Sequence, residues 1–247
     1  MIARGYEETG CCDAGDSPDC ITYDFRGSEL KSPTVSDSFT LFMLKLKTFT
    51  GGIAETNGYL LQIGDCFLAV DAPEGMADWL TRQNFTPDVL LLTHQHFDHV
   101  LDAGKIQTQF KSPVFAFSAL SRELTLEKQF GVGPGSPYSV PEFRVDTMLE
   151  GTKSIEVGGL IWNLLHIPGH SPDSICFHQP ELGIVFGGDV LFLDGIGRSD
   201  FPGGSGSLLI SGIKEKLFEL PDETKVFPGH GPSTTVGRER QENPFLA

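Results

Sequence analysis

The sequence has few basic residues and no long apolar run. Among its 247 residues, 18 Lys and Arg stand against 33 Asp and Glu, which gives a formal net charge of −15. A protein that binds nucleic acid usually carries a basic patch or stripe, so we expect no nucleic-acid partner. No apolar run approaches the roughly 18 residues that a membrane helix needs, and residues 1–8 lack the apolar core of a secretory signal. We therefore expect a cytoplasmic protein with no membrane partner.

Cysteine is also scarce, with five residues: Cys11, Cys12, Cys20, Cys66 and Cys176. An odd number in a chain of this size argues against a disulfide framework. Cys66 and Cys176 lie in apolar, strand-like runs and are predicted to pack as small hydrophobic residues. The other three cluster in a Gly- and Asp-rich segment near the N-terminus. A surface extension that contains thiols is the simpler interpretation of that cluster, and a metal or redox role is the alternative.

Residues 1–38 lack hydrophobic periodicity and contain clusters of Gly, Asp, Ser and Pro, so we expect a partly ordered N-terminal extension. Residues 39–247 are expected to form one domain, because no interdomain linker is evident in them. Strand and helix patterns alternate early and strands cluster in the middle, which favours a layered α/β architecture with a mixed sheet. The predicted helices are 76–83, 100–110, 120–130 and 208–220, and the predicted strands are 41–49, 58–63, 66–70, 89–92, 114–117, 160–165, 174–177, 183–186 and 225–227.

Residues 93–99, Thr-His-Gln-His-Phe-Asp-His, follow a short predicted strand. His94 and His96 are two residues apart in an extended segment, so both imidazoles point to the same side and can bind one metal ion. Asp98 and His99 follow where the chain turns toward a helix, and they can face a second ion nearby. Burying these groups without a metal would leave several unpaired polar atoms, each costing roughly 1–3 kcal/mol. The segment therefore predicts a metal site.

Further metal-ligand side chains lie at turns that follow apolar runs. His170 and His230 each occur in a Pro-Gly-His sequence, and Asp189 follows two glycines. Rigid turns at one rim of a sheet can bring such ligands together. His178 lies within an apolar run and is interpreted as a structural residue. His166 is ambiguous, because it can either orient a ligand or simply pack.

The His-x-His-x-Asp-His pattern of residues 94–99 resembles the signature of the metallo-β-lactamase superfamily, and the later ligands match its remaining motifs in order. The resemblance covers about residues 40–247. It implies a four-layer αββα sandwich with two divalent metals at one edge; zinc is expected, with iron or manganese as alternatives. By the same resemblance, one metal would be held by His94, His96 and His170, the other by Asp98, His99 and His230, and Asp189 would bridge the two.

Residues 187–192, 195–200 and 229–235 are similar to the short bacterial glyoxalase II-like hydrolases, which resemble hydroxyacylglutathione hydrolase. This similarity implies hydrolysis of a thioester such as S-D-lactoylglutathione, with Asp98 and Asp189 acting beside a metal-bound hydroxide. Arg198 falls where longer glyoxalase II enzymes place a basic glutathione contact, and Asp200 falls near a tyrosine of those enzymes. Both are therefore candidate substrate contacts, whereas Thr93 and His166 are candidates to orient the metal ligands.

A thioester suits this chemistry because a thiol, with a pKa of about 8.5, leaves without a strong general acid. An amide nitrogen would need a proton donor, and the sequence offers no obvious one. The acyl group, the carrier thiol and the oligomeric state stay open at this point.

Other functions are weaker alternatives. A persulfide dioxygenase with one iron shares the His-x-His-x-Asp-His pattern but differs in the last ligand motif. A nuclease would be expected to show a basic surface, and a hydrolase of other esters or phosphodiesters is a further alternative. A silent metal-binding module would be expected to lack a ligand. β-Lactam hydrolysis fits the position of Asp98 poorly.

Overall fold

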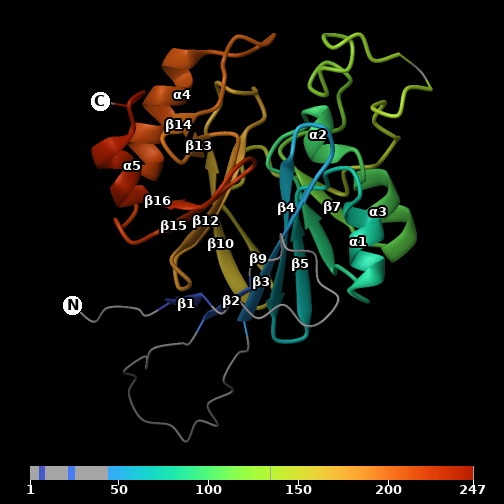
Figure 1. Ribbon diagram of the computed structural model, residues 1–247, viewed down its shortest axis with the longest axis horizontal. Coiled ribbons are helices and arrows are strands. Elements are labelled where there is room, and N and C mark those ends of the chain that lie inside the picture. The colour runs from blue at the N-terminus through green and yellow to red at the C-terminus, as the bar shows by residue number, and fades with distance from the viewer. Residues whose placement is uncertain (1–5, 9–21, 26–43, 134, 247) are drawn as a thin grey trace, which may run out of the picture.

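The computed structural model describes residues 6–8, 22–25, 44–133 and 135–246 (Figure 1). Cys11, Cys12 and Cys20 lie outside the described residues, as does most of the predicted extension 1–38. Two short strands of that extension are described, and the second pairs with the main sheet. No helix among the described residues is long and apolar enough to cross a bilayer.

Within the described residues, one sheet contains eight strands in chain order: β1 (Tyr6–Glu8), β2 (Thr22–Phe25), β3 (Leu44–Gly51), β4 (Thr56–Ile63), β5 (Cys66–Val70), β6 (Val89–Leu91), β7 (Val114–Ala116) and β8 (Thr147–Met148). Neighbours are antiparallel from β1 to β5 and parallel from β5 to β8. A two-residue turn of Gly64 and Asp65 joins β4 to β5 as an antiparallel hairpin.

The second sheet contains six strands among the described residues, in the order β16 (Thr234–Thr235), β15 (Lys225–Pro228), β12 (Ile184–Gly188), β11 (Ile175–Gln179), β10 (Leu160–His166) and β9 (Ser154–Val157). Only the β12–β15 pair is parallel in this sheet as described. A separate hairpin joins β13 (Leu191–Phe192) to β14 (Gly195–Ile196). The strands predicted between residues 58 and 227 are confirmed to within two residues at each end.

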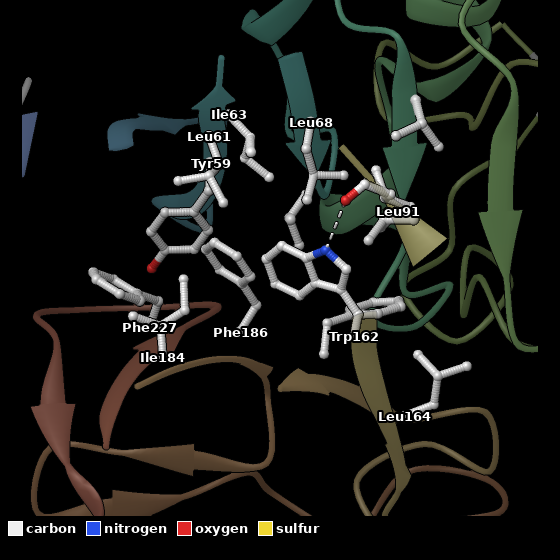
Figure 2. Close-up of a cluster of buried hydrophobic side chains, with 14 of the residues drawn as sticks. Tyr59, Leu61, Ile63, Leu68, Leu91, Trp162, Leu164, Ile184, Phe186 and Phe227 are labelled. Carbon is white, nitrogen blue, oxygen red and sulfur yellow. Dashed lines mark hydrogen bonds between the residues drawn. The ribbon is translucent and has the colours of Figure 1, made fainter. Parts of the chain in front are cut away.

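The main core lies between the two sheets (Figure 2). Side chains alternate along the strands, so Tyr59 and Leu61 of β4 face the second sheet while Leu60 faces away from it. The Tyr59 ring packs against Phe186 and Phe227 of the second sheet, with ring centroids 5.2 and 5.6 Å apart. Both sheets therefore bury one apolar face against the other.

Helices cover the outer faces of both sheets (Figure 1). The first sheet packs on α1 (Met76–Arg82), α2 (Phe97–Val100) and α3 (Ala103–Phe110). The second packs on α4 (Gly206–Gly212), its π-helical continuation η1 (Ile213–Leu217) and α5 (Val236–Glu242). Cys176 is buried in this last layer and Cys66 packs at the edge of the central core, as predicted. The predicted four-layer αββα sandwich is confirmed.

The predicted helix over residues 120–130 is wrong, because that segment forms successive turns. Leu126 has a φ of 58°, which interrupts a right-handed helix. The buried carboxylate of Glu127 accepts hydrogen bonds from the Thr125 hydroxyl, the Ser139 hydroxyl and the Val140 amide. These contacts fold the segment back on residues 139–140. Helix α5 was not predicted from the sequence.

Candidate metal centre

Seven His and Asp side chains of the described chain meet at one edge of the two sheets. The metal-ligand residues predicted from the sequence arrive from the segment after β6, from α2, from the turn before β11 and from the ends of β12 and β15. α2 and the β13–β14 hairpin lie at this same end of the molecule (Figure 1). Each of three groups has ligand atoms within 4.8 Å of one another: His94, His96 and His170; His94, His99 and Asp189; and Asp98, His99 and His230.

The first group consists of three imidazoles whose ring nitrogens converge. His96 Nδ1 lies 3.1 Å from His94 Nε2 and 2.8 Å from His170 Nε2. His170 Nδ1 donates to the Arg198 carbonyl at 2.8 Å, which places the proton on Nδ1 and leaves the Nε2 lone pair facing inward. Burial lowers the pKa of His96 to about 3 and holds the pKa values of His94 and His170 below their usual range. Neutral imidazoles are the form that binds a metal.

Asp98, His99 and His230 form what we call the second ligand group, as distinct from the first ligand group of His94, His96 and His170; it combines one carboxylate with two imidazoles. Asp98 Oδ2 lies 3.5 Å from His99 Nε2 and 3.4 Å from His230 Nε2, and it accepts a hydrogen bond from the Thr56 hydroxyl at 2.7 Å. Burial alone would raise the pKa of Asp98, but His99, His230 and Thr56 lower it to about 2. The backbone carbonyl of Ala54 lies 3.1 Å from His230 Nδ1, so His230 also presents Nε2 to the site. Thr56 is a contact that the sequence analysis missed.

Asp189 lies between the two groups. Its Oδ1 is 3.3 Å from His99 Nε2, and its Oδ2 is 3.4 Å from His170 Nε2 and 3.3 Å from His230 Nε2. Burial alone would raise the pKa of Asp189, but the surrounding imidazoles hold it well below its usual range. The carboxylate is therefore ionised and faces ligands of both groups.

The donor set fits divalent metals. Among the described residues, His99 Nε2 and Asp189 Oδ1 are buried without any hydrogen-bond partner. Such unpaired atoms cost roughly 1–3 kcal/mol each unless another group satisfies them. Imidazole nitrogens and carboxylate oxygens are ligands that zinc and iron both accept. A pair of metal ions between these side chains would satisfy both orphaned atoms, so the residues are consistent with a binuclear site.

Asp71 contacts residues of the site without belonging to the seven candidate ligands, and this role was not predicted from the sequence. Its buried carboxylate accepts hydrogen bonds from the Thr93 amide at 2.8 Å and the Thr93 hydroxyl at 2.8 Å, and it lies 2.9 Å from His99 Nδ1. Thr93 in turn contacts His94 Nδ1 at 3.1 Å. Burial alone would lower the pKa of His99, but Asp189, Asp98 and Asp71 raise it well above its usual range. Asp71 is an acidic residue directly after the buried strand β5, and this position could have indicated its role.

Two glycines allow the segments to approach closely. A side chain at Gly229 would overlap Asp189 Oδ1 and would lie 2.6 Å from His99 Cε1. Gly188 has a φ of 49°, and a side chain there would meet the Thr93 hydroxyl. Both positions therefore require glycine for the ligands to occupy their places.

His166 and His178 lie apart from the seven ligand side chains. His166 Nε2 is 2.9 Å from the Pro172 carbonyl, and its ring stacks on Phe117 with centroids 4.1 Å apart. His178 is buried in β11, where burial lowers its pKa. The structure thus places His166 against Phe117 rather than against a predicted metal ligand.

Arg198 and Asp200 lie at the rim of the centre. The Arg198 guanidinium binds the Asp200 carboxylate through two hydrogen bonds, of 2.7 and 2.6 Å, and both side chains are more than half exposed. The same guanidinium lies 4.1 Å from the centre of the Phe201 ring. Arg198 therefore has its charge paired within the chain, while its backbone holds His170.

The sequence of residues 56–230 matches the profile described as the Metallo-beta-lactamase superfamily. An uncharacterized protein of Mycobacterium tuberculosis is 38% identical over 216 residues, which cover 80% of this chain and 96% of that protein. A probable metallo-hydrolase of Bacillus subtilis, YqgX, is 34% identical and covers 82% and 98%. The hydroxyacylglutathione hydrolase GloC of Haemophilus influenzae is 36% identical and covers 72% and 86%.

Solved structures of similar proteins belong to the same superfamily. The BLEG-1 B3 metallo-beta-lactamase superposes with a TM-score of 0.71 and 34% identity, over 82% of this chain and 99% of that one. The protein TTHA1623 in a di-iron-bound form superposes with a TM-score of 0.67 and 33% identity, over 81% and 99%. The matched segment, the fold and the convergent His and Asp side chains agree, and the chain belongs to the metallo-beta-lactamase superfamily.

Proposed function

We propose that this protein hydrolyses thioesters at a two-metal centre, in the manner of glyoxalase II-like enzymes. The observation that carries the proposal is the position of Asp189, whose two oxygens face imidazoles of both ligand groups within 3.4 Å. One metal would bind His94, His96 and His170, and the other would bind Asp98, His99 and His230. The coarser assignment, a metal-dependent hydrolase of its superfamily with a His and Asp metal site, rests on the family match and on this cluster.

The reaction adds water to a thioester and yields a carboxylic acid and a thiol. When bound, two divalent ions would lower the pKa of water toward about 7 and polarise the carbonyl oxygen. The chain contributes Asp98 and Asp189 as ionised carboxylates, and its imidazoles keep their protons on the outer nitrogens where backbone carbonyls accept them. The C–S bond breaks with its electron pair on sulfur, and the thiolate needs no proton donor to leave. This requirement favours a thioester over an amide.

Two further features support the assignment. The relative GloC is named as a hydroxyacylglutathione hydrolase, and the structure of TTHA1623 contains two iron ions. We propose zinc as the metal, with iron and manganese as alternatives that the same ligands accept.

Arg198 and Asp200 are proposed to contact the carrier portion of the substrate. The Arg198 backbone carbonyl accepts a hydrogen bond from His170, so Arg198 lies directly beside a predicted metal ligand. Since its guanidinium is paired with Asp200, an anionic carrier such as glutathione has to compete with that carboxylate. Asp200→Ala is therefore expected to lower KM for S-D-lactoylglutathione, and Arg198→Ala is expected to raise it. An unchanged KM in both variants would remove these residues from substrate binding.

The alternatives to thioester hydrolysis are a persulfide dioxygenase activity and a β-lactamase activity. A persulfide dioxygenase would use one iron, whereas His230 and Asp98 here complete a second ligand group. A solved relative is a B3 metallo-beta-lactamase, so β-lactam hydrolysis belongs in the same assay although the sequence fits it poorly.

The test is steady-state hydrolysis of S-D-lactoylglutathione and a panel of other thioesters by protein of measured metal content. The same protein is assayed for oxygen uptake with glutathione persulfide and for hydrolysis of a β-lactam. We expect thioester hydrolysis to dominate. Absence of turnover on every thioester would refute the proposed function, and oxygen uptake with one iron per chain would establish the alternative.

A further inference from the structure

Three phenylalanine rings form a continuous row beside the first ligand group. Phe97 and Phe130 have ring centroids 5.3 Å apart, and Phe130 and Phe201 are 5.6 Å apart. Phe201 ends the row next to the ligands, 5.6 Å from the ring of His96 and 6.5 Å from that of His170. We call Phe97, Phe130 and Phe201 the aromatic row.

The row is assembled from segments that lie far apart in the sequence. Phe97 begins α2, Phe130 belongs to the turns that follow β7, and Phe201 precedes α4. The turns that carry Phe130 are folded back by the buried Glu127, whose carboxylate binds Val140 and Ser139. The position of Phe130 is thus built into the fold.

The row remains open to solvent although it is aromatic. Phe130 is 51% exposed, and Phe97 and Phe201 are half-buried. An exposed apolar surface is costly in water and commonly marks a binding site, and ligand sites are mostly apolar with a few polar groups near the chemistry. Here the apolar surface adjoins the predicted metal ligands, so its occupant is a part of the substrate close to the reacting carbonyl.

The charge at the row disfavours an anionic occupant that does not displace Asp200 from Arg198. Arg198 lies over Phe201, but its guanidinium already binds both oxygens of Asp200. The charge of Arg198 at this end of the row is therefore already paired, and the chain as a whole has a formal net charge of −15. The surface therefore favours a neutral apolar group.

We propose that the aromatic row binds an apolar, preferably planar group attached to the carbonyl that is hydrolysed. The substrate class is then thioesters with a bulky apolar acyl or thiol portion, rather than small hydrophilic ones. This inference rests on the proposed thioesterase function. An aromatic ring of the substrate would extend the row by offset or edge-to-face packing.

The test uses metal-loaded protein and two series of thioesters. In the first, the thiol is constant and the acyl group is acetyl, hexanoyl or phenylacetyl; in the second, the acetyl group is constant and the thiol varies from ethanethiol to 2-phenylethanethiol, two alkyl thiols of similar pKa. One additional apolar group of a substrate that binds an apolar protein surface typically raises kcat/KM by about tenfold or more. We expect at least about a tenfold preference in one series, and Phe130→Ala is expected to remove most of it. Phe245→Ala, a control at an exposed phenylalanine next to α5, is expected to keep the preference.

Calorimetry gives a readout that does not depend on turnover. Phenylacetate is expected to bind metal-loaded protein about tenfold more tightly than acetate, with the difference lost in Phe130→Ala. If thioesters are hydrolysed without preference in either series, or if Phe130→Ala changes all substrates equally, the inference is overturned. If no thioester is hydrolysed but phenylacetate still binds through Phe130, the proposed function fails and the aromatic row stands as a binding surface.

Discussion

Asp71 Oδ2 lies 2.9 Å from His99 Nδ1, and both side chains are fully buried. The carboxylate fixes the imidazole so that Nε2 faces Asp98 and Asp189. The same Asp71 carboxylate accepts two hydrogen bonds from Thr93, which orients the chain next to His94. One residue outside the predicted ligand set therefore contacts residues of both predicted ligand groups.

Asp71→Asn is expected to weaken metal binding by about 10- to 100-fold, because an orienting partner of a histidine ligand is replaced by an uncharged amide. Asparagine tolerates the φ of 58° at this position, so the backbone adds little strain. The measurement is metal affinity by competition with a chromogenic chelator. Asp88→Asn, at an exposed carboxylate that accepts one hydrogen bond from the Phe67 amide, is the matched control. Equal affinities in the two variants would refute the role of Asp71.

Gly229→Ala is expected to lose bound metal and activity, since the added Cβ overlaps Asp189 Oδ1 and crowds His99. Gly231→Ala is the comparison, because its Cβ meets nothing within 4 Å while its φ of 70° costs about 1–2 kcal/mol of stability. Metal analysis after dialysis and urea unfolding separate the two effects. Full metal retention by Gly229→Ala would show that the ligands do not need this close approach.

Asp173→Asn is expected to change how stability depends on pH. Burial raises the pKa of Asp173 to about 6, although hydrogen bonds from Ser171 and Gln95 lower it. The folded state then binds more protons than the unfolded state between pH 4 and 6, so stability falls as pH rises through this window. From pH 5 to pH 8, the wild type is expected to lose about 1 kcal/mol that the variant keeps.

Urea unfolding of wild type and Asp173→Asn at pH 5 and pH 8, with metal content held constant, measures this difference. Asp65→Asn, in the exposed β4–β5 turn, is the control and should show no such pH dependence. A variant whose stability follows the wild type at both pH values would contradict the buried, perturbed carboxyl.

His166→Ala is expected to retain its metals, because His166 packs on Phe117 and lies near the Pro172 carbonyl rather than a ligand. A modest loss of stability, of about 1 kcal/mol for the lost hydrogen bond, is the expected effect. Loss of one metal equivalent would instead place His166 among the residues that orient the ligands.

Local sequence patterns predicted the parts of the site that depend on short spacing. His94 and His96 follow a strand directly, so their common direction was predictable from residues two apart. The role of Asp71 was not predictable in this way. Asp71 meets Thr93 because β5 and β6 pair in parallel with Val70 opposite Leu91, and the sequence does not specify that register.

There are also physical reasons why the helix predicted over residues 120–130 was wrong and why α5 was not predicted. Residues 120–130 carry apolar spacing typical of a helix, but the tertiary contacts of Glu127 and the left-handed Leu126 override it. α5 contains a glycine and one apolar residue, Val236, so its hydrophobic pattern is weak. Its cap was a usable signal, since the Thr235 hydroxyl accepts a hydrogen bond from the Arg238 amide.

The most direct test of the two-metal account is a titration of metal-free protein with zinc, and separately with iron, while thioester turnover is followed. We expect turnover to be absent without metal, to rise with added metal and to reach its plateau at two equivalents per chain. Asp189→Ala should bind less metal and show no turnover. A plateau at one equivalent, or turnover in the metal-free protein, would contradict the account.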